Sequence, residues 1–200
     1  MEKKFTVFSG MILQEKEANM KQKVLVVVDM QNDFIDGSLG TKEAVSIVPA
    51  VCAKIRNAAA EDALIFATQD THAGNYMETR EGRFLPVPHC IRGTNGWEIR
   101  PEVADALGNA RVIEKYSFGS RELPDAIGEA LQIRGIDAKD AVIELIGLCT
   151  DICVVSNALI LKARFPETDM AVDPACCAGV TPEKHRAALE TMRSCQIEIR

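Results

Sequence analysis

Residues 145–155 read LIGLCTDICVV, and this stretch joins an apolar run to a helical pattern through a tight turn. The apolar run, 141–146, has the length of a buried strand and ends at Gly147, and helical spacing follows over 154–163. Cys153 is therefore expected where the carboxyl end of a strand meets the amino end of a helix. Unpaired N–H groups there lower the pKa of a thiol, which predicts a nucleophile. The alternative is that Cys149 and Cys153 are small buried apolar residues.

The rest of the chain alternates apolar runs of strand length with segments of helical period. The run VLVVVD at 24–29 is apolar on both faces, as in an interior strand of a parallel sheet. Further strands are expected at 63–68, 111–115, 141–146, 169–172 and 196–199, and helices at 44–61, 101–107, 123–133, 151–163 and 182–194. Thr181 is expected to cap the last helix, and Pro49 is compatible only with the first turn of helix 44–61. The alternation predicts a three-layer α/β/α domain with a mostly parallel six-stranded sheet.

The composition is typical of a globular protein that acts on a small molecule. Hydrophobic residues make up 47% of the 200, the net charge is −6 and no run is rich in Lys and Arg, so neither nucleic acid nor a membrane is expected as a partner. Seven scattered cysteines and the lack of an apolar signal region favour the reducing cytoplasm. We expect one domain over residues 23–200, preceded by a flexible leader over 1–22, with Met20 as an alternative start.

Ionisable side chains stand at the ends of the first four predicted strands. They are Asp29, Asp70, Lys115 and Cys153. In a parallel sheet these strand ends share the edge where ligands gather, so four such residues together predict a site. The loop 71–96 after the second strand has no steady period, and loops of this length are usually functional or disordered.

Five segments, in order, carry these residues and their neighbours. They are DMQNDF at 29–34, TQDTH at 68–72, PHCIRGT at 88–94, Lys115, and GLCTDICV at 147–154. Together they resemble the motifs of the isochorismatase-like cysteine hydrolases, and among these the nicotinamidase-related amidases. The resemblance runs from about Lys23 to the C-terminus and implies the Rossmann-like fold of that superfamily. It also implies an amidohydrolase that releases ammonia from a small carboxamide, with nicotinamide as the first candidate.

The resemblance implies a catalytic triad of Asp29, Lys115 and Cys153. Cys153 would attack the amide and form a thioester that water hydrolyses. Asp29 would take the thiol proton and later protonate the leaving amine, while Lys115 holds both groups by charge. The backbone N–H groups of Cys149 and Cys153 would form the oxyanion hole, with a cis peptide bond between Leu148 and Cys149.

The resemblance further implies a divalent metal, Zn or Fe/Mn, on Asp70, His72 and His89. In nicotinamidases this metal anchors the ring nitrogen of the substrate. From the spacing alone, solvated loop histidines are the commoner case, and the three residues would then be loop scaffolding. No organic cofactor is expected, because no G-x-G-x-x-G follows the first strand.

Some positions depart from the nicotinamidase pattern and leave the substrate open. Tyr76 stands where many nicotinamidases have a further histidine, and Pro86 where a tryptophan stacks on the pyridine ring. Phe34 and Trp97 remain as candidate substrate-binding aromatics. The lysine segment EKYSFGS also departs from the usual spacing of lysine, serine and phenylalanine.

Other polar residues are not assigned to the site. Arg80, Glu81 and Arg83 lie on the loop of the proposed ligands and could carry specificity, but a solvated charge cluster is the preferred interpretation. His185 is interpreted as a structural or surface residue. The remaining cysteines are interpreted as structural: Cys52, Cys90, Cys176, Cys177 and Cys195.

Two other functions stay open. An isochorismatase-type hydrolase of another small molecule would work without a nucleophilic cysteine, so Cys153 argues against it. A non-catalytic binding protein would not need the three-residue set. A homo-oligomer is expected from the resemblance alone.

Overall fold

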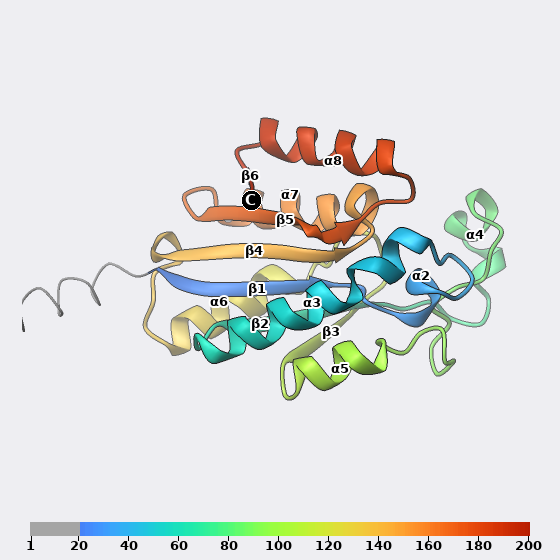
Figure 1. The fold of residues 1–200 in the computed structure, drawn as a ribbon, viewed down its shortest axis with the longest axis horizontal. Coiled ribbons are helices and arrows are strands. Elements are labelled where there is room, and N and C mark those ends of the chain that lie inside the picture. Colours follow the sequence, from blue (N-terminus) through green and yellow to red (C-terminus); the bar gives the residue numbers. More distant parts are fainter. Residues whose placement is uncertain (1–20) are drawn as a thin grey trace, which may run out of the picture.

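The structure, a computed structural model, describes residues 21–200 and contains one six-stranded sheet. The strands lie in the order β3-β2-β1-β4-β5-β6, and every neighbouring pair is parallel (Figure 1). Their bounds are β1 Gln22–Val28, β2 Leu64–Asp70, β3 Arg111–Lys115, β4 Ala141–Leu148, β5 Asp169–Ala178 and β6 Glu198–Ile199. The predicted parallel α/β architecture is confirmed.

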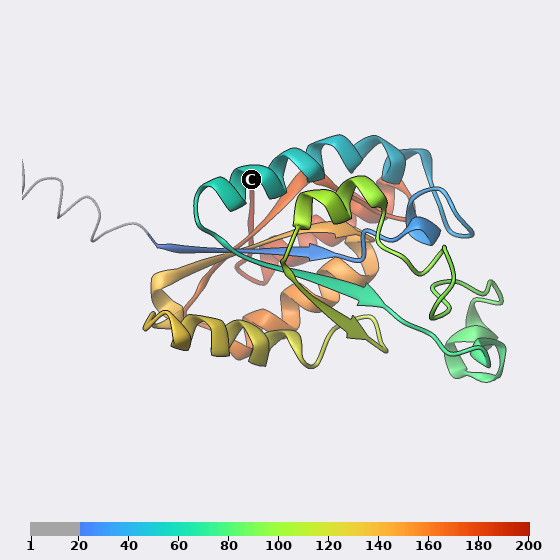
Figure 2. The same ribbon diagram turned by 90° about the horizontal axis from the view of Figure 1, so that it is seen from below.

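Helices cover both faces of the sheet. Figure 2 shows α3 (Lys42–Ala60) and α5 (Pro101–Leu107) on one face and α6 (Leu123–Ile133) and α7 (Val155–Arg164) on the other. Helix α8 (Pro182–Ser194) packs against α7. The shorter helical segments are α2 Asn32–Ile35, η1 Tyr76–Glu78, α4 Arg80–Phe84, η2 Ala138–Asp140 and the π-helical turn η3 Thr150–Val154. Because helices lie on both sides, Val24 to Val28 of β1 are at most 2% exposed, which explains their unbroken apolar run.

The order of the strands reverses between β1 and β4. These neighbours are far apart in sequence, and beyond their carboxyl ends lies the crevice in which open α/β sheets bind ligands. The segment that carries η1 and α4 projects past the same edge (Figures 1 and 2). The fold therefore brings the ends of β1, β2, β3 and β4 to one place.

Several predicted boundaries were wrong. Helix 44–61 in fact begins at Lys42, because Thr41 caps it by accepting a hydrogen bond from the N–H of Ala44. Pro49 therefore lies inside α3, where its missing N–H leaves a carbonyl one turn earlier, on Val45, without a helical donor. Val45 is 46% exposed, so a water molecule can donate a hydrogen bond to this carbonyl instead. The predicted Thr181 cap of α8 is confirmed by its bond from the N–H of Lys184.

Other corrections concern the strands and the nucleophile turn. Asp70 is the last residue of β2 instead of following it, β5 continues to Ala178, and strand 196–199 shrinks to Glu198–Ile199. The helix predicted at 151–163 is a π-helical turn followed by α7. Gln22, predicted in the leader, opens β1, and the rest of the leader up to residue 20, with the alternative start at Met20, lies outside the described residues. Within 21–200, no helix combines the length and the apolar character needed to cross a membrane.

Candidate active site

A cavity of about 260 Å³ opens at the carboxyl ends of the strands. Most of its lining is apolar: Phe34, Leu39, Ala44, Leu85, Phe118, Leu148, Ile152 and Val180. The polar lining residues with side chains able to donate, accept or ionise are Thr41, Asp70, Glu81, Cys149, Cys153 and Lys184. An apolar hollow with a few convergent polar groups is the usual form of a small-molecule site.

Asp29, Lys115 and Cys153 meet at the carboxyl-end edge of the sheet. The Nζ of Lys115 lies 2.8 Å from Oδ2 of Asp29 and 3.5 Å from Sγ of Cys153. All three residues are buried, at 0%, 2% and 5% exposure. The structure thus brings together the three residues that the sequence proposed as a triad.

The register of the sheet explains how Lys115 is held. Asp70 and Lys115 are directly paired between β2 and β3, and Nζ of Lys115 lies 2.8 Å from Oδ1 of Asp70. Thr68, opposite Val28 in β1, donates its hydroxyl to Oδ1 of Asp29 at 2.7 Å. Sequence reasoning missed Thr68, although it lies in the TQDTH segment.

Gln31 is a second residue that sequence reasoning missed. It is fully buried; its side-chain oxygen accepts a hydrogen bond from the N–H of Asp70, and its amide donates to the carbonyl of the same residue. Asp29 itself has φ of 47°, in the left-handed region, and its N–H donates to the carbonyl of Thr68. The loop after β1 is therefore tied to the end of β2 by both backbone and side chain.

The expected lowering of the pKa of the Cys153 thiol was wrong in direction. Burial raises this pKa well above its usual value, Asp29 adds to the rise, and Lys115 opposes it only in part. Cys153 lies inside the π-helical turn, two residues before the first residue of α7 at Val155, and burial is the largest cause of its pKa shift. Burial also raises the pKa of Asp29 against the opposing charge of Lys115. The resting pair is therefore a protonated thiol beside a carboxylate of increased basicity.

The turn between β4 and Cys153 has an unusual backbone. The peptide bond between Leu148 and Cys149 is cis, as the resemblance implied. Gly147 has φ of 116°, and a Cβ there would lie 2.1 Å from the carbonyl oxygen of Val28, so glycine is required. The carbonyl of Cys149 accepts hydrogen bonds from the N–H groups of Ile152 and Val154, which closes the turn.

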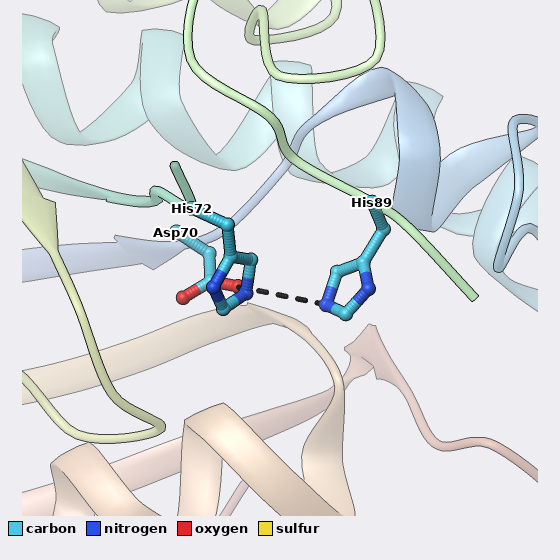
Figure 3. A group of neighbouring side chains, drawn as sticks. All are labelled: Asp70, His72 and His89. Carbon is cyan, nitrogen blue, oxygen red and sulfur yellow. Dashed lines mark ion pairs between the residues drawn. The ribbon is translucent and has the colours of Figure 1, made fainter. Parts of the chain in front are cut away.

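Asp70, His72 and His89 form a compact donor group (Figure 3). One ligand atom from each lies within 4.8 Å of the others, and all three residues are buried. Nδ1 of His89 is 2.9 Å from the carbonyl of Val87, which leaves Nε2 free to bind. Nε2 of His72 lies 3.0 Å from Asp70 but makes no aligned hydrogen bond, so it is a buried polar atom without a satisfied partner. One carboxylate and two imidazoles fit a divalent transition metal.

Glu81 was wrongly assigned to a solvated charge cluster. Its carboxylate lies 3.7 Å from Nε2 of His72 and 3.8 Å from Nε2 of His89, and it lines the cavity. Two contacts orient the short helix α4 that carries it. Thr79 caps the helix by accepting from the N–H of Gly82, and Gly82 packs so closely on Tyr76 that a Cβ would lie 2.1 Å from the Tyr76 carbonyl.

The predicted aromatic residues separate into lining and supporting groups. Phe34 lines the cavity, and its ring is 5.5 Å from that of His89. Trp97 does not line it, and its indole N–H donates to the hydroxyl of Thr71. Tyr76 is buried edge-on against both imidazoles and donates its hydroxyl to the carbonyl of Leu85. Phe118 lines the cavity and was missed, although an aromatic three residues after Lys115 was a visible signal.

Comparison with known proteins gives consistent matches over nearly the whole chain. The family model described as the isochorismatase domain matches residues 23–200. A nicotinamidase/pyrazinamidase of Mycobacterium tuberculosis is 28% identical over 188 residues, which cover 88% of this chain and 97% of that protein.

Two solved structures are similar at TM-scores above 0.7. The pyrazinamidase of Pyrococcus horikoshii, in complex with zinc, is 30% identical with a TM-score of 0.75, covering 90% of this chain and 98% of that one. The N-carbamoylsarcosine amidase of Thermoplasma acidophilum is 26% identical with a TM-score of 0.72, covering 90% and 95%.

Proposed function

This chain belongs to the isochorismatase family and is a nicotinamidase-related hydrolase of carbon–nitrogen amide bonds, and from this premise we propose that Cys153 cleaves a small carboxamide through a thioester. Nicotinamide is the first candidate substrate. The observation that carries the proposal is the buried contact of Lys115 with both Asp29, at 2.8 Å, and Cys153, at 3.5 Å. The proposed catalytic domain spans residues 23–200.

The first half of the reaction transfers the acyl group to sulfur. As Sγ of Cys153 attacks the amide carbon, its proton passes to Asp29, whose raised pKa makes it a better base than an ordinary carboxylate. The positive charge of Lys115 stabilises the developing thiolate. The N–H groups of Cys149 and Cys153 would bind the oxyanion, and Asp29 then protonates the amine as the carbon–nitrogen bond breaks and ammonia leaves.

The second half consumes water. Asp29, again ionised, would take a proton from a water molecule as its oxygen attacks the thioester carbon. The carbon–sulfur bond breaks, the proton returns to Cys153, and the carboxylic acid is released. The sum is one amide and one water converted to one carboxylic acid and one ammonia.

We propose that Asp70, His72, His89 and Glu81 hold a divalent metal. The support is the buried, unsatisfied Nε2 of His72 together with the Glu81 carboxylate facing both imidazoles. When bound, the ion supplies a Lewis acid that anchors a ring nitrogen or another neutral donor of the substrate. Phe34 and Phe118 in the apolar lining favour a flat, aromatic body for that substrate.

The test measures ammonia release from a panel of small carboxamides. Nicotinamide, pyrazinamide, a carbamoyl compound and a maleamate-like compound are compared for wild type, Cys153→Ala and a control, Cys195→Ser. We expect turnover of an aromatic amide that falls by at least about a thousandfold in Cys153→Ala and is unchanged in the control. Intact mass after rapid acid quench should show one acyl group on wild type. Activity that survives Cys153→Ala would favour the isochorismatase-type alternative, and no turnover of any amide would favour a binding protein.

A further inference from the structure

The turn that carries the proposed nucleophile is bonded to the start of α8. The hydroxyl of Thr150 and Nδ1 of His185 form a hydrogen bond of 2.8 Å. The N–H of Val180, just before α8, donates to the side-chain oxygen of Asp151 at 2.9 Å. Thr150 and Asp151, which are neighbours in this turn, are thus both hydrogen-bonded to residues at or just before the start of α8.

The bond to His185 is one that the turn cannot replace easily. Thr150 is fully buried, so water cannot reach its hydroxyl. Among the described residues, His185 is the only hydrogen-bond partner of that hydroxyl. A buried hydroxyl that loses its partner either destabilises the fold or forces the backbone to move. Because Cys149 directly precedes Thr150, such a movement would displace the backbone of Cys149.

Gly179 shows how closely the two segments approach. A Cβ at this position would lie 2.8 Å from Oδ1 of Asp151 and 2.9 Å from Cβ of His185. The turn and the start of α8 therefore touch with no room for a side chain between them. Gly179 also lines the cavity with Cys149 and Cys153, so a shift of this contact would change the wall of the site.

We propose that His185 is a positioning residue that, through Thr150, holds the Cys149 N–H and the Cys153 sulfur in the arrangement that binds the transition state of amide cleavage. The expected effect on kcat rests on the proposed function, whereas the position of the Cys153 sulfur can be tested without turnover. His185 touches no reacting atom. Its effect belongs to kcat, because the groups it places act on charge that develops only during the reaction.

The protonation of His185 suits this role. Burial lowers its pKa, nearby Arg186 lowers it further and Asp151 opposes the shift. A neutral ring offers Nδ1 as an acceptor, and the Thr150 hydroxyl then donates to it. The other charged residues of this helical turn, Glu183 and Lys184, are exposed.

The experiment compares His185→Ala with His185→Asn. Asparagine can place a polar atom near the position of Nδ1, so it can restore the bond to Thr150, whereas alanine cannot. We expect His185→Ala to lower kcat by at least about tenfold with KM within about twofold, and His185→Asn to recover most of the loss. Thr150→Val should cause a similar loss, and the double variant His185→Ala/Thr150→Val no more than either alone. Glu190→Gln, an exposed residue further along the same helix, serves as the control.

A second measurement separates this inference from the proposed function. The rate at which iodoacetamide alkylates Cys153, mapped by peptide mass, should fall in His185→Ala and return in His185→Asn, because a displaced sulfur loses its contact with Lys115. That result would support the positioning role even if no amide were hydrolysed. Unchanged kcat and alkylation in His185→Ala, or a loss that His185→Asn does not recover, would overturn it.

Discussion

Nζ of Lys115 lies 2.8 Å from Oδ2 of Asp29, and neither residue is more than 2% exposed. A charged pair is buried this completely only when each ion has partners, and Lys115 also has Asp70 while Asp29 also has Thr68. The pair stands next to the sulfur of Cys153, so its charges act on the proton of the thiol.

Asp29→Asn should abolish most of the amide hydrolysis. An amide cannot take the thiol proton, so kcat/KM is expected to fall by about 10² to 10⁴, the usual contribution of a general base. Steady-state ammonia release measures the effect. Asp36→Asn, an exposed carboxylate on the same loop, is the control. Activity of Asp29→Asn within tenfold of wild type would exclude Asp29 as the base.

The thiol of Cys153 should remain protonated at neutral pH. Because burial and Asp29 raise its pKa above the ordinary 9.0, the thiolate fraction grows with pH throughout the neutral range and beyond. The rate of alkylation by iodoacetamide without substrate is therefore expected to keep rising past about pH 9. A plateau reached below about pH 8 would show a lowered pKa and contradict the raised value.

Glu81 should contribute to metal affinity. Protein purified without chelator is expected to contain a divalent metal by elemental analysis, and His72→Ala should lose it. Glu81→Gln should weaken binding by about 10- to 100-fold, while Glu78→Gln, exposed on the same segment, should have no effect. Metal removal should raise KM more than it lowers kcat. A wild-type protein without metal above background would leave these residues as loop scaffolding.

Phe118 should help to bind an aromatic substrate. Phe118→Ala removes apolar contact area from the cavity and is expected to raise KM for aromatic amides about three- to tenfold with little change in kcat. Tyr116→Ala, exposed on the same segment and outside this cavity, is the matched control. Equal effects of the two variants would show that Phe118 makes no specific contact.

Gly147→Ala should destabilise the protein. Alanine must adopt φ of 116° and place its Cβ against the carbonyl oxygen of Val28. The free energy of unfolding is therefore expected to fall by about 1–3 kcal/mol. Denaturant unfolding followed by circular dichroism measures the change. Gly74→Ala, where a Cβ meets nothing within 4 Å, should stay within about 0.5 kcal/mol of wild type.

The sequence by itself determined the sheet and the positions of its reactive residues. The apolar runs of β1 and β4 required burial on both faces, and a parallel sheet places all its strand ends at one edge. Asp29, Lys115 and Cys153 could therefore be grouped before any contact was known. The motif resemblance pointed to the same residues and to the donors Asp70, His72 and His89.

Only the tertiary structure decided which neighbours these residues have. Glu81 lies on the one-turn helix α4 inside a long loop, and Phe118 lies on an irregular segment, so no period in the sequence fixes the direction of either side chain. His185 meets Thr150 only because α8 packs on the turn after β4. The direction of the Cys153 pKa shift also depends on burial and on charges from distant strands. Strand periodicity is a local property that the chain carries in its order of residues, whereas proton affinity and side-chain contact arise from segments that meet only after folding.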